Sequence, residues 1–184
     1  MNRILLALAI CGFLALSGCV SAPPEGAETV ILIHGLGRTP ASMVILGSRL
    51  ESEGFQVVRF GYPSTSEPID ALVDYLKAEV GRCCSAEKES VHFVTHSMGG
   101  VLVRAYLAQQ PRPHGGRVVM LSPPSQGSEV VDAFVESPLL RSLVGPAGVT
   151  LGTDAAGIAS QLPPIRFSLG IITGDRSLNP WAHG

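Results

Sequence analysis

Residues 91–102 read VHFVTHSMGGVL, and this stretch decides the fold. Its first half is rich in β-branched and aromatic residues, which favours a buried strand, and residues 99–109 continue as an apolar helix. Ser97 stands between the two, beside residues small enough to let strand and helix approach closely. A serine at such a turn exposes its hydroxyl above the sheet and leaves the backbone N–H of Met98 facing the same space. The stretch therefore predicts a nucleophilic serine at position 97.

The same alternation of strand and helix extends over most of the chain. Residues 29–34, TVILIH, form a continuous apolar run that indicates a strand buried on both faces. Residues 137–164 show no clear period, and we expect a loop-rich insertion with short helices there. The complete prediction comprises strands over 29–34, 55–60, 91–95, 117–121 and 165–173, and helices over 41–53, 68–80, 99–109 and 130–135. This order predicts a mostly parallel sheet with helices on both faces and an active site at the carboxyl ends of the strands.

The composition is that of one globular domain. The chain has 184 residues, of which 46% are hydrophobic and 15% charged, so it can bury a sizeable core. The net charge is −2 and basic residues do not cluster, which argues against a nucleic-acid partner. Cysteine and histidine do not occur at metal-ligand spacing, so we expect neither a metal nor another cofactor.

The first 18 residues have a composition of their own. Arg3 gives a short positive segment, residues 4–16 are almost wholly apolar, and small residues follow at positions 17 and 18. The apolar run is too short to span a bilayer comfortably. We therefore predict that residues 1–18 are a signal peptide and that the protein is exported.

The end of this segment, LSGC at residues 16–19, resembles the lipobox of bacterial lipoproteins. The resemblance implies cleavage before Cys19 and lipidation of that residue, which would anchor the protein in a membrane. Val20, in the position where Asp would retain a lipoprotein elsewhere, implies the outer membrane, facing the periplasm. An ordinary signal peptide with a nearby cleavage site is the alternative. Residues 19–28 would then be a tether, and residues 29–184 the folded domain.

Cys83 and Cys84 are adjacent in the sequence. A bridge between them would close a strained small ring. The alternatives are free thiols or disulfides to another molecule in an oxidising compartment.

Four motifs resemble segments of a known family. THSMGG at residues 95–100 matches the nucleophile elbow Gly-x-Ser-x-Gly, with Thr95 in place of the first glycine. HGLG at 34–37 ends the first strand, LSPPSQGS at 121–128 follows the fourth, and GYPS at 61–64 is a weaker match. On these motifs the chain resembles small bacterial lipases and esterases of the α/β-hydrolase fold.

The resemblance implies a serine carboxylic-ester hydrolase that works through an acyl-enzyme on Ser97. The backbone N–H groups of Leu36 and Met98 would hold the oxyanion. His34 would bond its own loop rather than act as the base. The substrate would be a small-molecule or lipid ester, with lipids favoured by a membrane anchor. The sequence leaves the oligomeric state open.

A serine nucleophile also needs a histidine base and an orienting acid, in the chain order serine, acid, histidine. His183 is the histidine that comes late enough, and Asp175 directly follows the last predicted strand; Asp154 is a weaker candidate. Because so few residues follow position 173, we expect a hydrolase fold that is short at its C-terminus and lacks its final strand and helix. The alternative function is therefore a truncated, catalytically inactive lipoprotein or binding module that keeps the elbow without a base.

Overall fold

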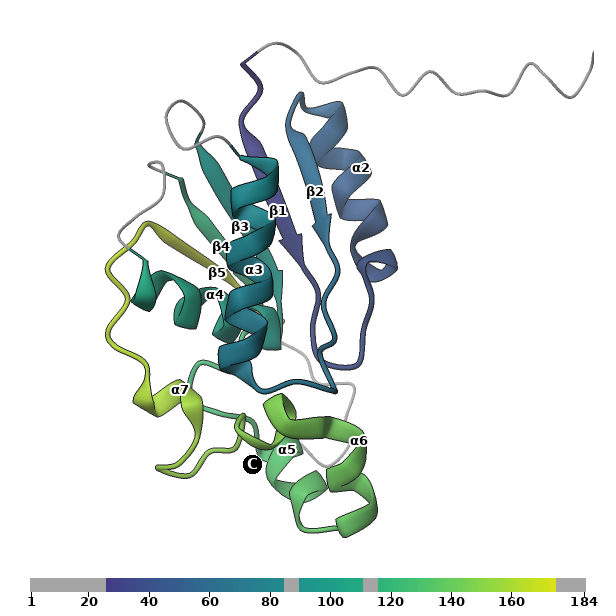
Figure 1. Cartoon of the computed structure of the whole chain (residues 1–184), viewed down its shortest axis with the longest axis vertical. Coiled ribbons are helices and arrows are strands. Elements are labelled where there is room, and N and C mark those ends of the chain that lie inside the picture. Colours follow the sequence, from purple (N-terminus) through teal and green to yellow (C-terminus); the bar gives the residue numbers. More distant parts are fainter. Residues whose placement is uncertain (1–25, 85–89, 111–115, 175–184) are drawn as a thin grey trace, which may run out of the picture.

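The computed structural model describes residues 26–84, 90–110 and 116–174. They form one five-stranded sheet in the order β2-β1-β3-β4-β5, in which every neighbouring pair is parallel (Figure 1). The strands are β1 (Thr29–Ile33), β2 (Gln56–Phe60), β3 (Val91–His96), β4 (Val118–Leu121) and β5 (Leu169–Ile172). The helices are η1 (Pro40–Met43, a 3₁₀ turn), α2 (Val44–Ser52), α3 (Ile69–Cys83), α4 (Met98–Gln109), α5 (Glu129–Val135), α6 (Pro138–Val149) and α7 (Ile158–Gln161).

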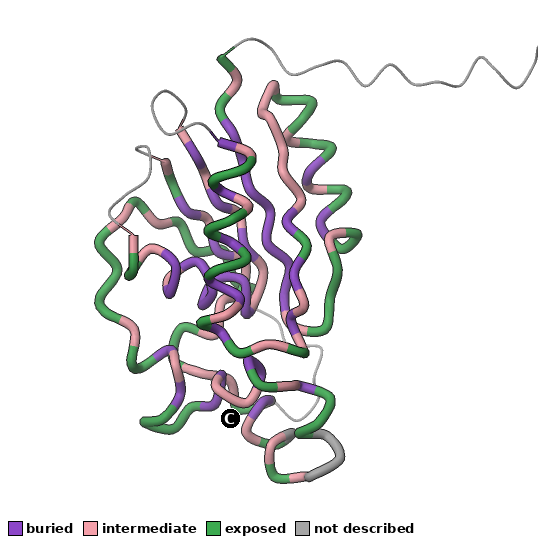
Figure 2. The backbone as a smooth tube through the Cα atoms, in the orientation of Figure 1, coloured by how far each residue is buried: buried purple, intermediate pink, exposed green. Residues whose placement is uncertain are grey.

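Two hydrophobic layers hold the sheet, one on each face. On one face Val30 and Leu32 pack with Met43, where α2 covers the sheet. On the other face Ile31 and Ile33 pack with the apolar sides of α3 and α4. Figure 2 shows the buried residues running along β1 and the inner sides of these helices. The predicted parallel sheet with helices on both faces is confirmed.

The register brings the ends of three strands level with one another. Ile33 of β1 pairs with Phe60 of β2 and with Thr95 of β3. Each strand therefore delivers the residues that follow it to the same edge of the sheet. This edge holds the loop after β1, the turn after β2 and the elbow after β3.

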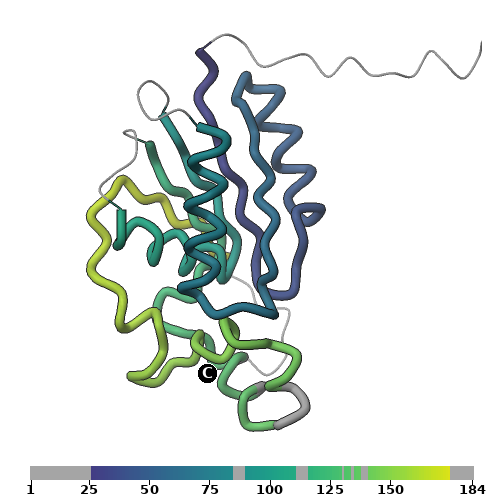
Figure 3. The backbone as a smooth tube through the Cα atoms, in the orientation of Figure 1, coloured from purple at the N-terminus to yellow at the C-terminus, as the bar shows by residue number. Residues whose placement is uncertain are grey.

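The structure departs from the sequence prediction in the last strand, whereas the insertion contains short helices as expected. β5 is shorter than the predicted 165–173, and it is an exposed strand in which Ile172 keeps 60% of its surface accessible. The insertion contains α6, whose helical backbone is interrupted at Gly145 (φ 67°, ψ −177°), directly before Pro146. In Figures 1 and 3 the insertion lies beyond the carboxyl ends of the strands before the chain returns to β5.

Cys83 and Cys84, at the end of α3, form a disulfide with each other, which is the pairing that the sequence argument disfavoured. None of the helices in the described part of the chain is both long enough and apolar enough to span a membrane. The predicted signal peptide, the lipidation site Cys19 and most of the tether lie outside the described residues.

Candidate active site

Ser97 occupies a strained backbone position between β3 and α4. Its φ is 51° and its ψ is −124°, a conformation that side-chain-bearing residues rarely adopt. The turn is fixed on both sides, because Ser97 N–H donates to the Leu121 carbonyl (2.9 Å) and Gly100 N–H donates to the Ser97 carbonyl (2.9 Å). The serine is partly exposed, and its hydroxyl makes no hydrogen bond to any described residue. Backbone strain of this kind clusters at functional sites.

The two glycines of the elbow allow α4 to approach the sheet. A Cβ at Gly99 would lie 2.8 Å from the Ile33 carbonyl oxygen and 2.9 Å from that of His34. A Cβ at Gly100 would lie 3.1 Å from the Pro123 Cβ. The first turn of α4 therefore sits against the end of β1. Its free N–H groups and its positive dipole end are directed at the edge of the sheet where Ser97 lies.

The loop after β1 lies directly against the serine. A Cβ at Gly35 would be 3.1 Å from the Ser97 Cβ and 2.9 Å from Nδ1 of His96. Within the described residues, the N–H groups of Leu36 and Met98 have no hydrogen-bond acceptor. Two backbone donors without a described acceptor therefore lie on the two segments that flank this partly exposed serine.

His34 is a structural residue of this loop. Its side chain is buried, its ring stacks on Tyr62 (centroids 4.3 Å apart), and its Nδ1 lies 2.9 Å from the Gly35 carbonyl oxygen. Burial lowers the pKa of His34, and the hydrogen bond to Gly35 offsets this only in part. The imidazole is therefore neutral and engaged with its own backbone, as the motif implied.

The structure brings no histidine–carboxylate pair to Ser97 among the described residues. The His96 ring lies against Gly35, and burial, together with the nearby Arg38 charge, lowers its pKa. His92 faces the opposite end of β3, where its Nε2 is 3.4 Å from Glu28. Asp175 and His183 lie outside the described residues, so their assignment as acid and base stays a prediction.

The residues after β2 contribute to the site, a role that was not predicted from the sequence. The Tyr62 hydroxyl donates to the His34 carbonyl (2.6 Å), and the Ser64 hydroxyl accepts from the Gly37 N–H (3.1 Å). Both side chains are buried. The available signal was GYPS at residues 61–64, where a glycine and a proline end the strand at the level of the elbow.

The insertion covers one side of the loop after β1. A Cβ at Gly148 of α6 would lie 2.9 Å from Cδ2 of Leu36, and Gly145 packs directly on the Thr65 carbonyl. The insertion is also tied to α5, since the Asp132 carboxylate accepts from the Thr153 hydroxyl (2.6 Å). The Leu36 side chain is therefore held between the sheet and α6.

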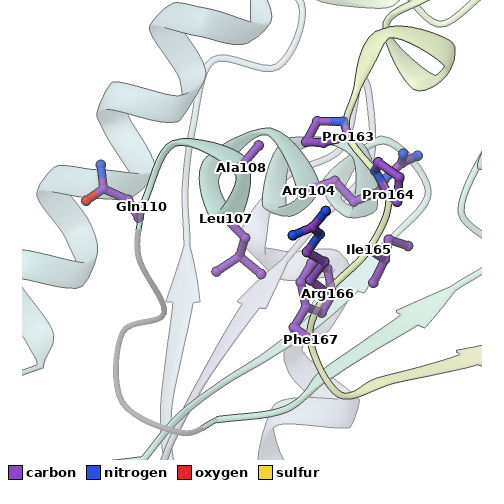
Figure 4. Close-up of a pocket in the computed structure, with 9 residues that line it drawn as sticks. All are labelled: Arg104, Leu107, Ala108, Gln110, Pro163, Pro164, Ile165, Arg166 and Phe167. Atoms are coloured by element: carbon purple, nitrogen blue, oxygen red, sulfur yellow. The ribbon is translucent and has the colours of Figure 1, made fainter.

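A cavity of about 330 Å³ opens elsewhere, beside the second half of α4 (Figure 4). Its walls are the apolar and arginine side chains of that half-helix and of residues 163–167. Because Ser97 precedes the first residue of α4, this cavity is not the space in front of Ser97. No cluster of three or more metal-ligating side chains occurs in the part of the chain that the structure describes.

These features define a class of protein. The model of the family described as "Alpha/beta hydrolase family" matches residues 30–182, and the chain belongs to this family.

Among solved structures, the chain is similar to phospholipase PlaB from Legionella pneumophila (TM-score 0.61, 19% identity, 82% of this chain and 39% of that one). It is also similar to the mature form of the Bacillus licheniformis lipase BlEst2 (TM-score 0.59, 19% identity, 77% of this chain and 60% of that one). At this identity the likeness concerns the fold, and the chain spans less than two thirds of either protein. No curated protein matches the sequence.

Proposed function

We propose that this protein is a serine hydrolase that cleaves carboxylic esters through an acyl-enzyme on Ser97. The observation that carries the proposal is the pairing of a strained, partly exposed serine with two unpaired backbone donors, the N–H groups of Leu36 and Met98. Membership of the α/β-hydrolase family and the fold that it shares with a phospholipase and a lipase support the same reaction class.

In this reaction the Ser97 oxygen attacks the ester carbonyl carbon while a base takes the hydroxyl proton. The carbonyl oxygen becomes negatively charged, and the two N–H groups stabilise it. The bond to the alcohol oxygen then breaks, the alcohol leaves with the proton, and an acyl group remains on Ser97. Water attacks that acyl group in the same way and releases the acid. We assign the base to His183 and its orienting acid to Asp175.

We further propose that the substrates include lipid esters. The motif at residues 16–19 would anchor the protein at a membrane surface, and the insertion beside Leu36 is largely apolar. Membrane attachment would concentrate the enzyme where such esters are found.

The test is labelling with a fluorophosphonate, which reacts with an activated serine whatever the substrate. We expect label on the wild-type chain and none on Ser97→Ala, while Ser125→Ala, the matched control, labels normally. Label that persists on Ser97→Ala would overturn the assignment, and a wild-type chain without label would favour the inactive alternative.

A second measurement concerns the acid and base. Hydrolysis of p-nitrophenyl butyrate should fall by about 10³-fold or more in His183→Ala, leaving the residual rate that the oxyanion site alone supplies. Asp175→Ala should lose activity as well. If neither variant changes the rate, other groups are the acid and base.

A further inference from the structure

The turn after β2 holds the loop after β1 at two separate points. Tyr62 binds the His34 carbonyl through its hydroxyl (2.6 Å), and the Ser64 oxygen binds the Gly37 N–H (3.1 Å). The attachments lie on either side of Leu36, whose N–H is one of the two oxyanion donors in the proposed function. They are possible because β1 and β2 are parallel and end level with each other.

Together with the loop's own bonds, these contacts hold three consecutive peptide groups. Tyr62 holds the peptide group between residues 34 and 35, and Ser64 holds the one between residues 36 and 37. The peptide group between them carries the Leu36 N–H, and its carbonyl, that of Gly35, accepts from the Arg38 N–H (3.2 Å) and contacts the His34 ring (2.9 Å). In a trans peptide the N–H points opposite to the C=O. Holding the Gly35 carbonyl on one side therefore directs the Leu36 N–H to the other.

Tyr62 is itself rigid. Its ring is stacked between His34 (4.3 Å) and Phe60 (5.2 Å), and burial raises the pKa of its hydroxyl, which stays a donor. Ser64 is buried too. A buried hydroxyl that is locked by packing fixes its partner far better than an exposed one.

We propose that Tyr62 and Ser64 are positioning residues for the oxyanion site. They keep the Leu36 N–H directed at the space in front of Ser97 before substrate arrives. This inference rests on the proposed function. It adds that the donor on the loop after β1 depends on hydroxyls from the turn after β2.

The experiment compares Tyr62→Phe and Ser64→Ala with two matched controls. Tyr106→Phe removes a hydroxyl from another buried tyrosine, and Ser42→Ala removes one from a serine that bonds only within its own turn. Loss of a whole oxyanion donor costs about 10²–10³-fold, so we expect misorientation to slow fluorophosphonate labelling of Ser97 by about 10-fold or more. With p-nitrophenyl butyrate, kcat should fall while KM is unchanged. Both controls should react at the wild-type rate, and Ser64→Thr, which keeps the oxygen, should recover most of it.

A second readout does not depend on catalysis. Hydrogen exchange at the Gly37 amide should accelerate in Ser64→Ala and not in Ser42→Ala, with both variants folded by circular dichroism. If the wild-type chain labels at Ser97, and Tyr62→Phe and Ser64→Ala label as fast as the wild-type chain, the inference is wrong and the proposed function stands. If the wild-type chain does not label, the proposed function is wrong, and the inference falls with it.

Discussion

Replacing Ser97 with glycine should stabilise the protein relative to replacing it with alanine. Both substitutions remove the hydroxyl, but only glycine removes the Cβ, which is strained at φ 51° and ψ −124°. Relief of such strain is worth about 1–3 kcal/mol. Glycine gives back about 0.4–1 kcal/mol because it makes the unfolded chain more flexible. At the middle of both ranges the net gain is about 1 kcal/mol in the free energy of unfolding.

Thermal unfolding followed by circular dichroism measures this difference. In a chain of this size 1 kcal/mol moves Tm by about 2–4 °C, so Ser97→Gly should melt about 2–4 °C above Ser97→Ala. Ser48, exposed in the middle of α2, is the control. There the order should reverse, because glycine in a helix is less stable than alanine by about 0.5–1 kcal/mol. A Ser97→Gly chain that melts at or below Ser97→Ala would refute the strained elbow.

Two further predictions concern the loop after β1 and the insertion. Burial lowers the pKa of His34 in the folded chain, while the unfolded value is near 6.5, so at pH values between the two the unfolded chain binds more protons. The free energy of unfolding should therefore fall as the pH drops. Urea midpoints measured from pH 7 to pH 5 should fall less steeply in His34→Gln than in the wild-type chain, and an unchanged slope would contradict this. Gly145→Ala should destabilise the protein by about 1–3 kcal/mol and expose the insertion to limited proteolysis, because the new Cβ would overlap the Thr65 carbonyl. Gly54→Ala, at another positive φ but in open space, should cost less, and equal losses would count against the packing argument.

The strands near the centre of the sheet could be predicted because burial on both faces leaves a simple pattern. Residues 29–33 are all buried, so their sequence is a continuous apolar run. The edge strand β5 has no such pattern, since most of its residues are exposed, and its length was overestimated. The short helices expected within residues 137–164 could not be placed individually, because the sequence of α6, PLLRSLVGPAGV, is apolar on most sides and interrupted at Gly145, so no period emerges.

The candidate site likewise contains some residues that could be predicted from the sequence and others that could not. Ser97, Met98 and Leu36 could be proposed from the sequence because each belongs to a short local motif. Tyr62 and Ser64 were not proposed, because their partners lie in the loop after another strand, and only the register of β1 against β2 brings them together. A contact of this kind has no local spacing from which it can be predicted.

The strand order also determines the stage of folding at which the candidate site forms. β1 lies between β2 and β3, so the loop after β1 meets the elbow only after the chain has completed two crossovers and paired residues 29–33 with residues 91–95. Such long-range pairing forms late and slowly compared with helices or hairpins. No early, locally folded intermediate can contain both of the proposed oxyanion donors. Reactivity of Ser97 would therefore be a kinetic probe of refolding, because it begins only after β1 and β3 have paired at the centre of the sheet.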